Sequence, residues 1–469
     1  MTRKVAVALG VGATALLAPA PAFAHGLVGK QDLPIPKVVF AWAACAVLVA
    51  SFVGLAALWP TARLQEMHEK TSFKVPSFFS PLAGAIGVAF FVFCIYAGLA
   101  GEQFSAQNNL IVTIVFVVFW VGLPFASVLL GDVFRAFNPW LAIARAVSWA
   151  GKRLGRGAPE PLPYPERVGR WPAVAGILIF AWVELVYVNK DDPSTLAIMA
   201  LAYAAVQLVG MSLYGIRTWE HNADAFGVYF GLFARLSPLH WTDGELRTRR
   251  PLEGVVHLDT PPGTVALLIT MIGTTSFDGF SQGPTWTSLA DDLQTLFLNI
   301  GFSAETALEL AFTVGLIGVV LAIGGLYRIG IAGMRSVHPA DDAGELARRF
   351  VHTLVPIALA YVVAHYFSLL VYQSQALAYL ASDPLGTGSD YFGTATLAIN
   401  YGVISATQVW YVQVAALLAG HIAGLILAHD KAIATYRDPK EAVRSQYWML
   451  TVMVCFTSLG LWLLSSVGT

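Results

Sequence analysis

Four ionisable residues lie within or directly beside long apolar stretches of this sequence, and they are Glu184, Asp278, His365 and His421. Ionisable side chains are costly to bury in apolar surroundings, so those found there usually bind a partner or perform a function. Carboxyl and imidazole groups can transfer protons, activate a nucleophile or bind a metal ion. These four residues are therefore the first candidates for a functional site.

A serine lies close to one of these carboxyls. The string Gly279-Phe-Ser-Gln-Gly283 fits the G-x-S-x-G pattern, which places a nucleophilic serine on a tight turn. Such a serine gives its proton to an imidazole, which a carboxylate orients. We expect Ser281 to be the nucleophile and His365 to be its base. The orienting carboxylate would be Asp278 or Glu184, although the strand that normally precedes this pattern is missing here.

The same side chains allow a second interpretation, in which a divalent metal ion activates water. His365, His421 and Asp278 are the candidate ligands for such an ion. Polar residues on the same segments are candidates for substrate contacts, and these are Gln282, Gln413 and Tyr411. The residue types and their spacing leave both interpretations open.

Other cofactors are disfavoured by motif and spacing. The sequence contains no P-loop, no Rossmann glycine pattern and no H-E-x-x-H string, which argues against a bound nucleotide and against a zinc protease. Paired histidines on membrane helices can hold haem. The pair His352 and His365 and the pair His421 and His429 differ in spacing, so haem is not expected.

The composition defines the surroundings of these residues. Of the 469 residues, 57% are hydrophobic and only 12% are charged, and the mean hydropathy is +0.65. A soluble domain has about 25% charged residues. The sequence therefore predicts an all-α, polytopic transmembrane helix bundle, because only lipid accepts so much exposed apolar surface. It excludes a soluble enzyme, a disordered protein and a nucleic-acid-binding protein.

A signal peptide and ten apolar runs divide the chain. Residues 1–24 have the positive start, the apolar core and the Ala22-Phe-Ala24 cleavage site of a cleaved signal peptide. Residues 25–469 are expected to form a single transmembrane domain. Its ten runs of about spanning length lie near residues 38–58, 79–99, 110–130, 172–188, 194–216, 263–277, 306–327, 351–372, 406–428 and 447–466.

The positive charges give an independent test of this map. If the mature chain begins outside at His25, the loops predicted to be cytoplasmic contain 23 Lys and Arg residues, and the outer side contains three. This distribution follows the positive-inside rule. The protein is therefore expected to cross the plasma membrane ten times, with both mature termini outside.

Helical rise estimates the depth of each polar group. The height above the cytoplasmic end of its helix is about 18 Å for Glu184, about 21 Å for His365 and about 24 Å for Gln413. The sixth run rises about 22 Å before it reaches the string from Asp278 to Gly283, whose glycines are expected to break the helix. A shared polar layer is predicted in the outer half of the membrane, with His421 about 9 Å lower.

Three shorter stretches are expected to lie along the membrane surface instead of crossing it. Residues 139–150 and 223–236 would lie on the cytoplasmic side, and residues 286–300 on the outer side. They have the length and mixed polarity of interfacial helices.

Several long strings resemble those of a known family. They are His25-Gly-Leu-Val-Gly-Lys-Gln-Asp-Leu-Pro-Ile-Pro36, Gly131-Asp-Val-Phe-Arg-Ala-Phe-Asn-Pro-Trp140, Ala202-Tyr-Ala-Ala-Val-Gln-Leu-Val-Gly-Met-Ser-Leu-Tyr-Gly215 and Thr274-Thr-Ser-Phe-Asp-Gly-Phe-Ser-Gln-Gly-Pro284. The chain resembles, along most of its length, the bacterial polytopic membrane proteins called fenitrothion hydrolases, which are common in actinobacteria. The resemblance implies hydrolysis of an organophosphate triester at its aryl ester bond, and it assigns no roles to individual residues.

Three functions remain open at this point. The leading hypothesis is a membrane-embedded hydrolase that acts on an apolar organophosphate or similar ester from the outer half of the bilayer. A transporter or channel for a small solute or metal ion would also suit a polar layer beside a broken helix. The third is a structural subunit of a membrane complex. The expected partners are the lipid bilayer, an apolar small molecule, and a second membrane subunit or another copy of this chain.

Overall fold

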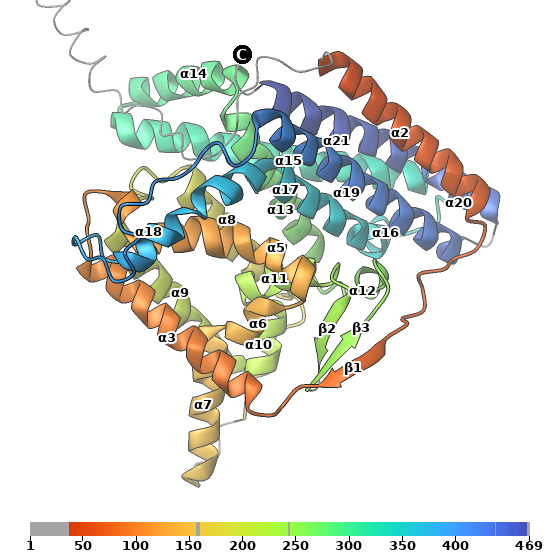
Figure 1. The fold of residues 1–469 in the computed structure, drawn as a ribbon. Coiled ribbons are helices and arrows are strands. Elements are labelled where there is room, and N and C mark those ends of the chain that lie inside the picture. The colour runs from red at the N-terminus through yellow and green to blue at the C-terminus, as the bar shows by residue number, and fades with distance from the viewer. Residues whose placement is uncertain (1–36, 156–159, 243, 437, 467–469) are drawn as a thin grey trace, which may run out of the picture.

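The computed structural model describes residues 37–155, 160–242, 244–436 and 438–466. The predicted signal peptide and the start of the mature chain lie outside these residues. Within them the chain is mostly helical, and the helices form one bundle (Figure 1). This agrees with the helical fold class that the composition predicts.

The helices and their bounds follow the predicted runs closely. The longer ones are α2 (Lys37–Leu58), α3 (Phe79–Ala100), α7 (Pro139–Arg153), α8 (Trp171–Leu185), α9 (Pro193–Tyr214), α11 (Ala225–Ala234), α13 (Thr264–Ser281), α14 (Pro284–Ile300), α15 (Ala304–Arg335), α17 (Leu354–Gln373), α19 (Ala406–Thr435) and α21 (Tyr447–Ser466). The shorter ones are η1 (Ala106–Asn108), α4 (Leu110–Thr113), η2 (Ile114–Gly122), α5 (Leu123–Leu130), α6 (Val133–Phe137), α10 (Ile216–Asn222), α12 (Glu253–Val256), α16 (Ala343–Phe350), η3 (Val351–Thr353), α18 (Ala376–Ser382) and α20 (Pro439–Ser445).

Six helical segments of the described chain are long and apolar enough to cross a membrane. They are Phe79–Ala100, Leu110–Leu130, Pro193–Tyr214, Ala304–Arg335, Ala343–Gln373 and Ala406–Thr435. The other four predicted runs also form helices, namely α2, α8, α13 and α21. The protein is thus a helical bundle suited to a lipid bilayer.

The bundle is centred on α17, which lies beside α13 with other helices on either side (Figure 1). The segment Ala343–Gln373, which contains α17, is 72% buried over its most apolar stretch. The other five long apolar segments are 28–50% buried over theirs. Side chains on α17 therefore face other helices on nearly every side. By contrast, α3 exposes an apolar stripe with helical spacing, which suits contact with lipid, and its members include Leu82, Ile86, Phe90 and Phe93.

A small antiparallel sheet was not predicted from the sequence. Its three strands are β1 (Lys70–Lys74), β2 (Leu239–Thr242) and β3 (Glu245–Thr248), in the order β1-β3-β2. They belong to loops expected on the cytoplasmic side. An available signal was the Asp-Gly dipeptide at positions 243 and 244, because this dipeptide favours tight hairpin turns.

The prediction of three surface helices is wrong for one of them. Residues 139–150 and 286–300 do form the partly exposed helices α7 and α14, and α7 projects from the body of the bundle (Figure 1). Residues 223–236, however, form α11, whose side chains are almost all buried. Its sequence is apolar on every side, which is the pattern of a helix enclosed by others.

Candidate functional site

Two helices that bear buried carboxyls, α8 and α13, begin side by side. The Arg170 amide donates to Pro262 O at 2.6 Å, and the Arg170 guanidinium donates to Thr264 Oγ1 at 3.1 Å. Gly263, which precedes α13, has a φ of +90°, and a Cβ there would lie 2.7 Å from Trp171 N. The close approach of the two helix starts therefore requires glycine at this position.

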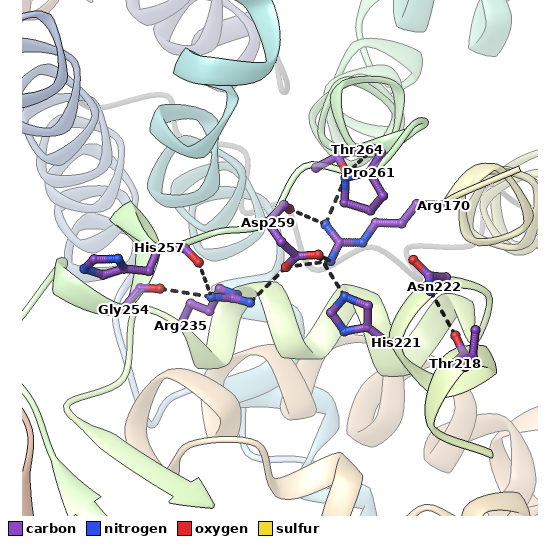
Figure 2. Close-up of polar contacts among 10 residues, drawn as sticks. All are labelled: Arg170, Thr218, His221, Asn222, Arg235, Gly254, His257, Asp259, Pro261 and Thr264. Carbon is purple, nitrogen blue, oxygen red and sulfur yellow. Dashed lines mark hydrogen bonds and ion pairs between the residues drawn. The ribbon is translucent and has the colours of Figure 1, made fainter. Parts of the chain in front are cut away.

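A cluster of ion pairs around Asp259 fixes the starts of α8 and α13 relative to each other (Figure 2). Asp259, on the loop before α13, accepts hydrogen bonds from Arg170 at 3.0 and 3.1 Å and from Arg235 at 3.2 Å. His221 Nε2 lies 2.8 Å from Asp259 Oδ2. Partial burial would raise the pKa of Asp259. The His221 hydrogen bond and the charges of Arg170 and Arg235 outweigh it and hold this pKa below its ordinary value.

The two helices then run in parallel to a second junction. Glu184 follows Arg170 by 14 residues, and Asp278 follows Thr264 by 14 residues. Each helix therefore rises about 21 Å between the two positions. Glu184 and Asp278 are buried and lie close enough for their charges to interact. The ion cluster at the start of α8 and α13 thus sets the height at which the two carboxyls meet.

Asp278 also contacts two neighbouring residues of α17. His365 Nε2 lies 2.7 Å from Asp278 Oδ2, and the Tyr366 hydroxyl donates to the same oxygen at 2.8 Å. All three side chains are buried. The structure therefore brings together Asp278, His365 and Glu184, which the sequence places on three separate segments. The arrangement can orient an imidazole and move a proton between it and a carboxyl.

Aromatic side chains enclose the two carboxyls. Trp120, on the π-helical segment η2, lies beside Glu184 and Tyr366. Tyr229, on the buried helix α11, also lies near Glu184. None of these three aromatic residues was predicted from the sequence, since tyrosine and tryptophan occur throughout this chain. The π-helix is a relevant signal in the structure, because such segments occur often at functional sites.

The predicted nucleophile lies one turn beyond Asp278 on the same helix. The Ser281 hydroxyl donates to Asp278 O at 2.8 Å, and Gln282 Nε2 donates to Ser281 Oγ at 3.3 Å. The helix break predicted within residues 278–283 lies at the end of that string, because α14 begins after Gly283 and α13 continues through Gly279 to Ser281. Glycine is tolerated there at a modest cost in helix propensity. Ser281 therefore stands on a helical turn at the end of α13, with Gln282 exposed beside it.

The other predicted substrate contacts lie on α19. Gln413 is buried, whereas Tyr411 is 46% exposed on the bundle surface. Gly420 of α19 packs against Pro356 and Ala360 of the antiparallel helix α17. Gln413 precedes Gly420 by seven residues, and His365 follows the contact with Pro356 and Ala360 by about seven. Because the two helices are antiparallel, Gln413 lies at about the level of His365. Gln413 therefore belongs to the layer of the candidate site, and Tyr411 faces away from the bundle.

His421 has different surroundings from His365. Its Nδ1 lies 2.7 Å from Leu417 O of its own helix, and its ring lies 6.2 Å from that of Tyr361. Tyr361 is one helical turn, about 6 Å, from His365. Within the described part of the chain, no group of three or more His, Cys, Asp or Glu side chains is arranged to hold a metal ion.

No protein-family model, no curated protein and no solved structure matches this chain.

We predict that Asp259→Asn lowers the free energy of unfolding by about 2 kcal/mol at pH 7. The variant leaves the buried Arg170 without its anionic partner, and the partial exposure of Asp259 limits the loss. Because the pKa of Asp259 is held low in the folded protein, its stabilisation is complete above about pH 4 and declines at lower pH. Thermal unfolding of the wild type and of Asp259→Asn at several pH values measures the difference in stability.

Glu245→Gln is the matched control, because it removes a carboxylate from an ion pair on the protein surface, with Arg247. It should change stability much less than Asp259→Asn does, because exposed ion pairs contribute little. A difference between wild type and Asp259→Asn that stays constant down to pH 3 would contradict the assignment of a low pKa to Asp259.

Proposed function

We propose that this protein is a membrane-embedded hydrolase that cleaves an apolar phosphotriester or a similar ester, with the Asp278–His365 pair as its general base. The contact of 2.7 Å between His365 Nε2 and Asp278 Oδ2 carries the proposal. A carboxylate in this position orients the imidazole and stabilises the imidazolium that forms when the ring takes a proton. The resemblance to fenitrothion hydrolases supports an aryl phosphotriester as the substrate.

The proposed membrane arrangement follows the charge distribution. We infer ten spans after a cleaved signal peptide, in a bacterial plasma membrane, with both mature termini outside. The six long apolar helices support the membrane location, and α2, α8, α13 and α21 supply the other four spans of this proposal. An apolar ester dissolves in lipid and would reach the His365 layer from the outer half of the bilayer.

The proposed chemistry uses the ring nitrogen of His365 that faces away from Asp278. This nitrogen, Nδ1, points towards Gly279, where a Cβ would lie 3.5 Å from it. His365 takes a proton from water as the water oxygen bonds to phosphorus and the bond from phosphorus to the aryl oxygen breaks. The aryl oxide leaves with the electron pair and receives the proton from His365. The products are a phosphodiester acid and a phenol.

Ser281 is the alternative nucleophile in the same reaction. Its hydroxyl is bonded to Asp278 O and lies in the outermost turn of α13, so it would have to leave that bond before it attacks phosphorus. Water needs no such rearrangement. We therefore place water first and Ser281 second.

The first test is turnover of diethyl 4-nitrophenyl phosphate by the purified protein in lipid nanodiscs. We expect His365→Asn and Asp278→Asn each to lower turnover by 100-fold or more, because general-base catalysis contributes about that much. Ser281→Ala should keep most of the activity if water is the nucleophile, and abolish it if Ser281 is. His421→Asn is the matched control and should retain activity. Full activity of His365→Asn with normal folding would refute the proposal.

A second test probes the space beside His365 Nδ1. Gly279→Ala should preserve the fold, because the new methyl group meets only ordinary contact distances and alanine favours helices. It should lower turnover about tenfold or more, since it crowds the position of the attacking water. Gly318→Ala, on α15 with open space around it, is the control. Equal turnover in both variants would place the water elsewhere.

A second function, proton-coupled transport, is favoured by one observation. Glu184 lies beside Asp278, so the site contains a second buried carboxyl that a general base does not need. Lys190 Nζ donates to Glu184 O at 2.8 Å and brings a cation to the same end of α8. Chains of acidic and imidazole groups within a membrane carry protons in many transporters.

Proteoliposomes with an internal pH dye distinguish the two functions. A transporter should discharge an imposed proton gradient, and Glu184→Gln should slow the discharge about tenfold while leaving ester turnover absent. A hydrolase should leave the gradient intact in the wild type and in Glu184→Gln. Asp259→Asn, assayed at pH 7, controls for leakage caused by weakened packing.

A further inference from the structure

A cavity opens where α17 ends and α19 begins. Its volume is about 540 Å³, which lies within the range of small-molecule sites. It is lined by Tyr372, Tyr401, Gly402, Val403, Ile404 and Ser405, together with the first residues of α19. None of these residues takes part in the Asp278 cluster, so the cavity is a separate feature.

The lining indicates the chemistry of a ligand. Among the described residues, no charged side chain lines the cavity, so an ion would find no oppositely charged partner in this lining. The rings of Tyr372 and Tyr401 lie 5.3 Å apart at an angle of 46° and form an open aromatic corner. Aromatic rings prefer edge and offset contacts with other rings at such separations. A neutral molecule with an aromatic ring therefore suits this cavity.

The walls of the cavity are held in place by hydrogen bonds. The Tyr372 hydroxyl donates to Ile404 O at 2.9 Å, which fixes the ring against the chain that leads into α19. Ser405 and Gln408 cap the start of α19 reciprocally. Tyr401 is 62% exposed, so its ring can be removed with little effect on packing.

The cavity lies on the helix face that carries the catalytic base of the proposed hydrolase. Tyr372 follows His365 by seven residues on α17. Seven residues are nearly two full turns, so both side chains project from the same face, about 10 Å apart along the axis. The antiparallel neighbour α19 begins beside Tyr372 and reaches the level of His365 near Gln413. The seam between α17 and α19 thus joins the cavity to the His365 layer.

We propose that this cavity binds the aromatic ring of a neutral aryl ester, as the first binding site for the substrate at the outer end of the α17–α19 seam. The assignment of the ligand as a substrate rests on the proposed hydrolase function. The preference for a neutral aromatic molecule rests only on the lining of the cavity.

The test is a binding measurement that needs no turnover. The probe is 4-nitroanisole, a neutral nitroaryl ether that contains no phosphoester bond. Binding to the full-length protein in nanodiscs is measured by equilibrium dialysis, with empty nanodiscs to subtract partition into lipid. 4-Nitrobenzoate tests the need for neutrality, and cyclohexyl methyl ether tests the need for an aromatic ring. We expect saturable binding of 4-nitroanisole and at least tenfold weaker binding of the other two.

Variants of Tyr401 locate the binding site. Tyr401→Ala should weaken binding of 4-nitroanisole about tenfold, because it removes one wall of the aromatic corner. Tyr401→Phe should bind within twofold of the wild type. Tyr391→Ala is the matched control, since Tyr391 is 70% exposed on the same loop and does not line the cavity.

The outcomes separate this inference from the proposed function. Unchanged binding by Tyr401→Ala, or equal binding of 4-nitrobenzoate, would overturn the inference even if the protein hydrolyses phosphotriesters. Binding that depends on Tyr401, in a protein without turnover, would support the cavity and reject the hydrolase. In an active enzyme, Tyr401→Ala should raise KM for diethyl 4-nitrophenyl phosphate about tenfold and leave kcat unchanged.

Discussion

A carboxyl group that enters an apolar bundle must find polar partners there, and Asp278 shows how this chain meets that requirement. Its side chain is fully buried, and one of its oxygens is approached by both His365 and Tyr366. These partners come from α17, which belongs to the most buried of the six long apolar segments. The central position of α17 lets it supply both partners, and aromatic residues from η2 and α11 lie beside the neighbouring carboxyl of Glu184.

The ends of α8 and α13 make this arrangement possible. Without a fixed start, two parallel helices could slide past each other, and Glu184 and Asp278 would no longer meet at one height. Asp259, on the loop before α13, pairs with Arg170 at the start of α8, and Arg235 and His221 hold Asp259 from the ends of α11 and α10 (Figure 2). The cluster lies about 21 Å from the buried carboxyls, so its influence passes through the rigid rise of the helices. Polar contacts at one end of the bundle therefore position polar groups deep inside it.

Sequence analysis could place the main residues of the site because helical rise is nearly constant. Counting residues from helix ends was enough to bring Asp278, His365 and Glu184 into one layer. The same counting could not identify Tyr366, since it follows His365 directly and consecutive helical residues normally point in different directions. Both side chains nevertheless reach Asp278 Oδ2.

Errors in the sequence analysis have separate physical causes. The glycines of residues 278–283 were expected to break the helix, but Gly279 remains within α13, because the helix penalty of one glycine is small. The enclosed helix α11 was placed at the surface because its length is too short to span a membrane, although its all-round apolar character indicated burial. The sheet pairs β1 with β3 across more than 170 residues, and local patterns contain no information about such distant pairing.

The π-helical segment η2 has a mechanical consequence for the site. Its hydrogen bonds join residues five apart, as the bond from Leu123 N to Val118 O shows, so each turn holds more residues than an α-helical turn. A bond that shifts from the fifth to the fourth residue would rotate every later side chain of that helix about its axis. Trp120 lies near the end of η2, beside Glu184. The winding of this segment therefore sets the direction in which the Trp120 indole leaves the helix axis, and with it the position of that indole beside the buried acid.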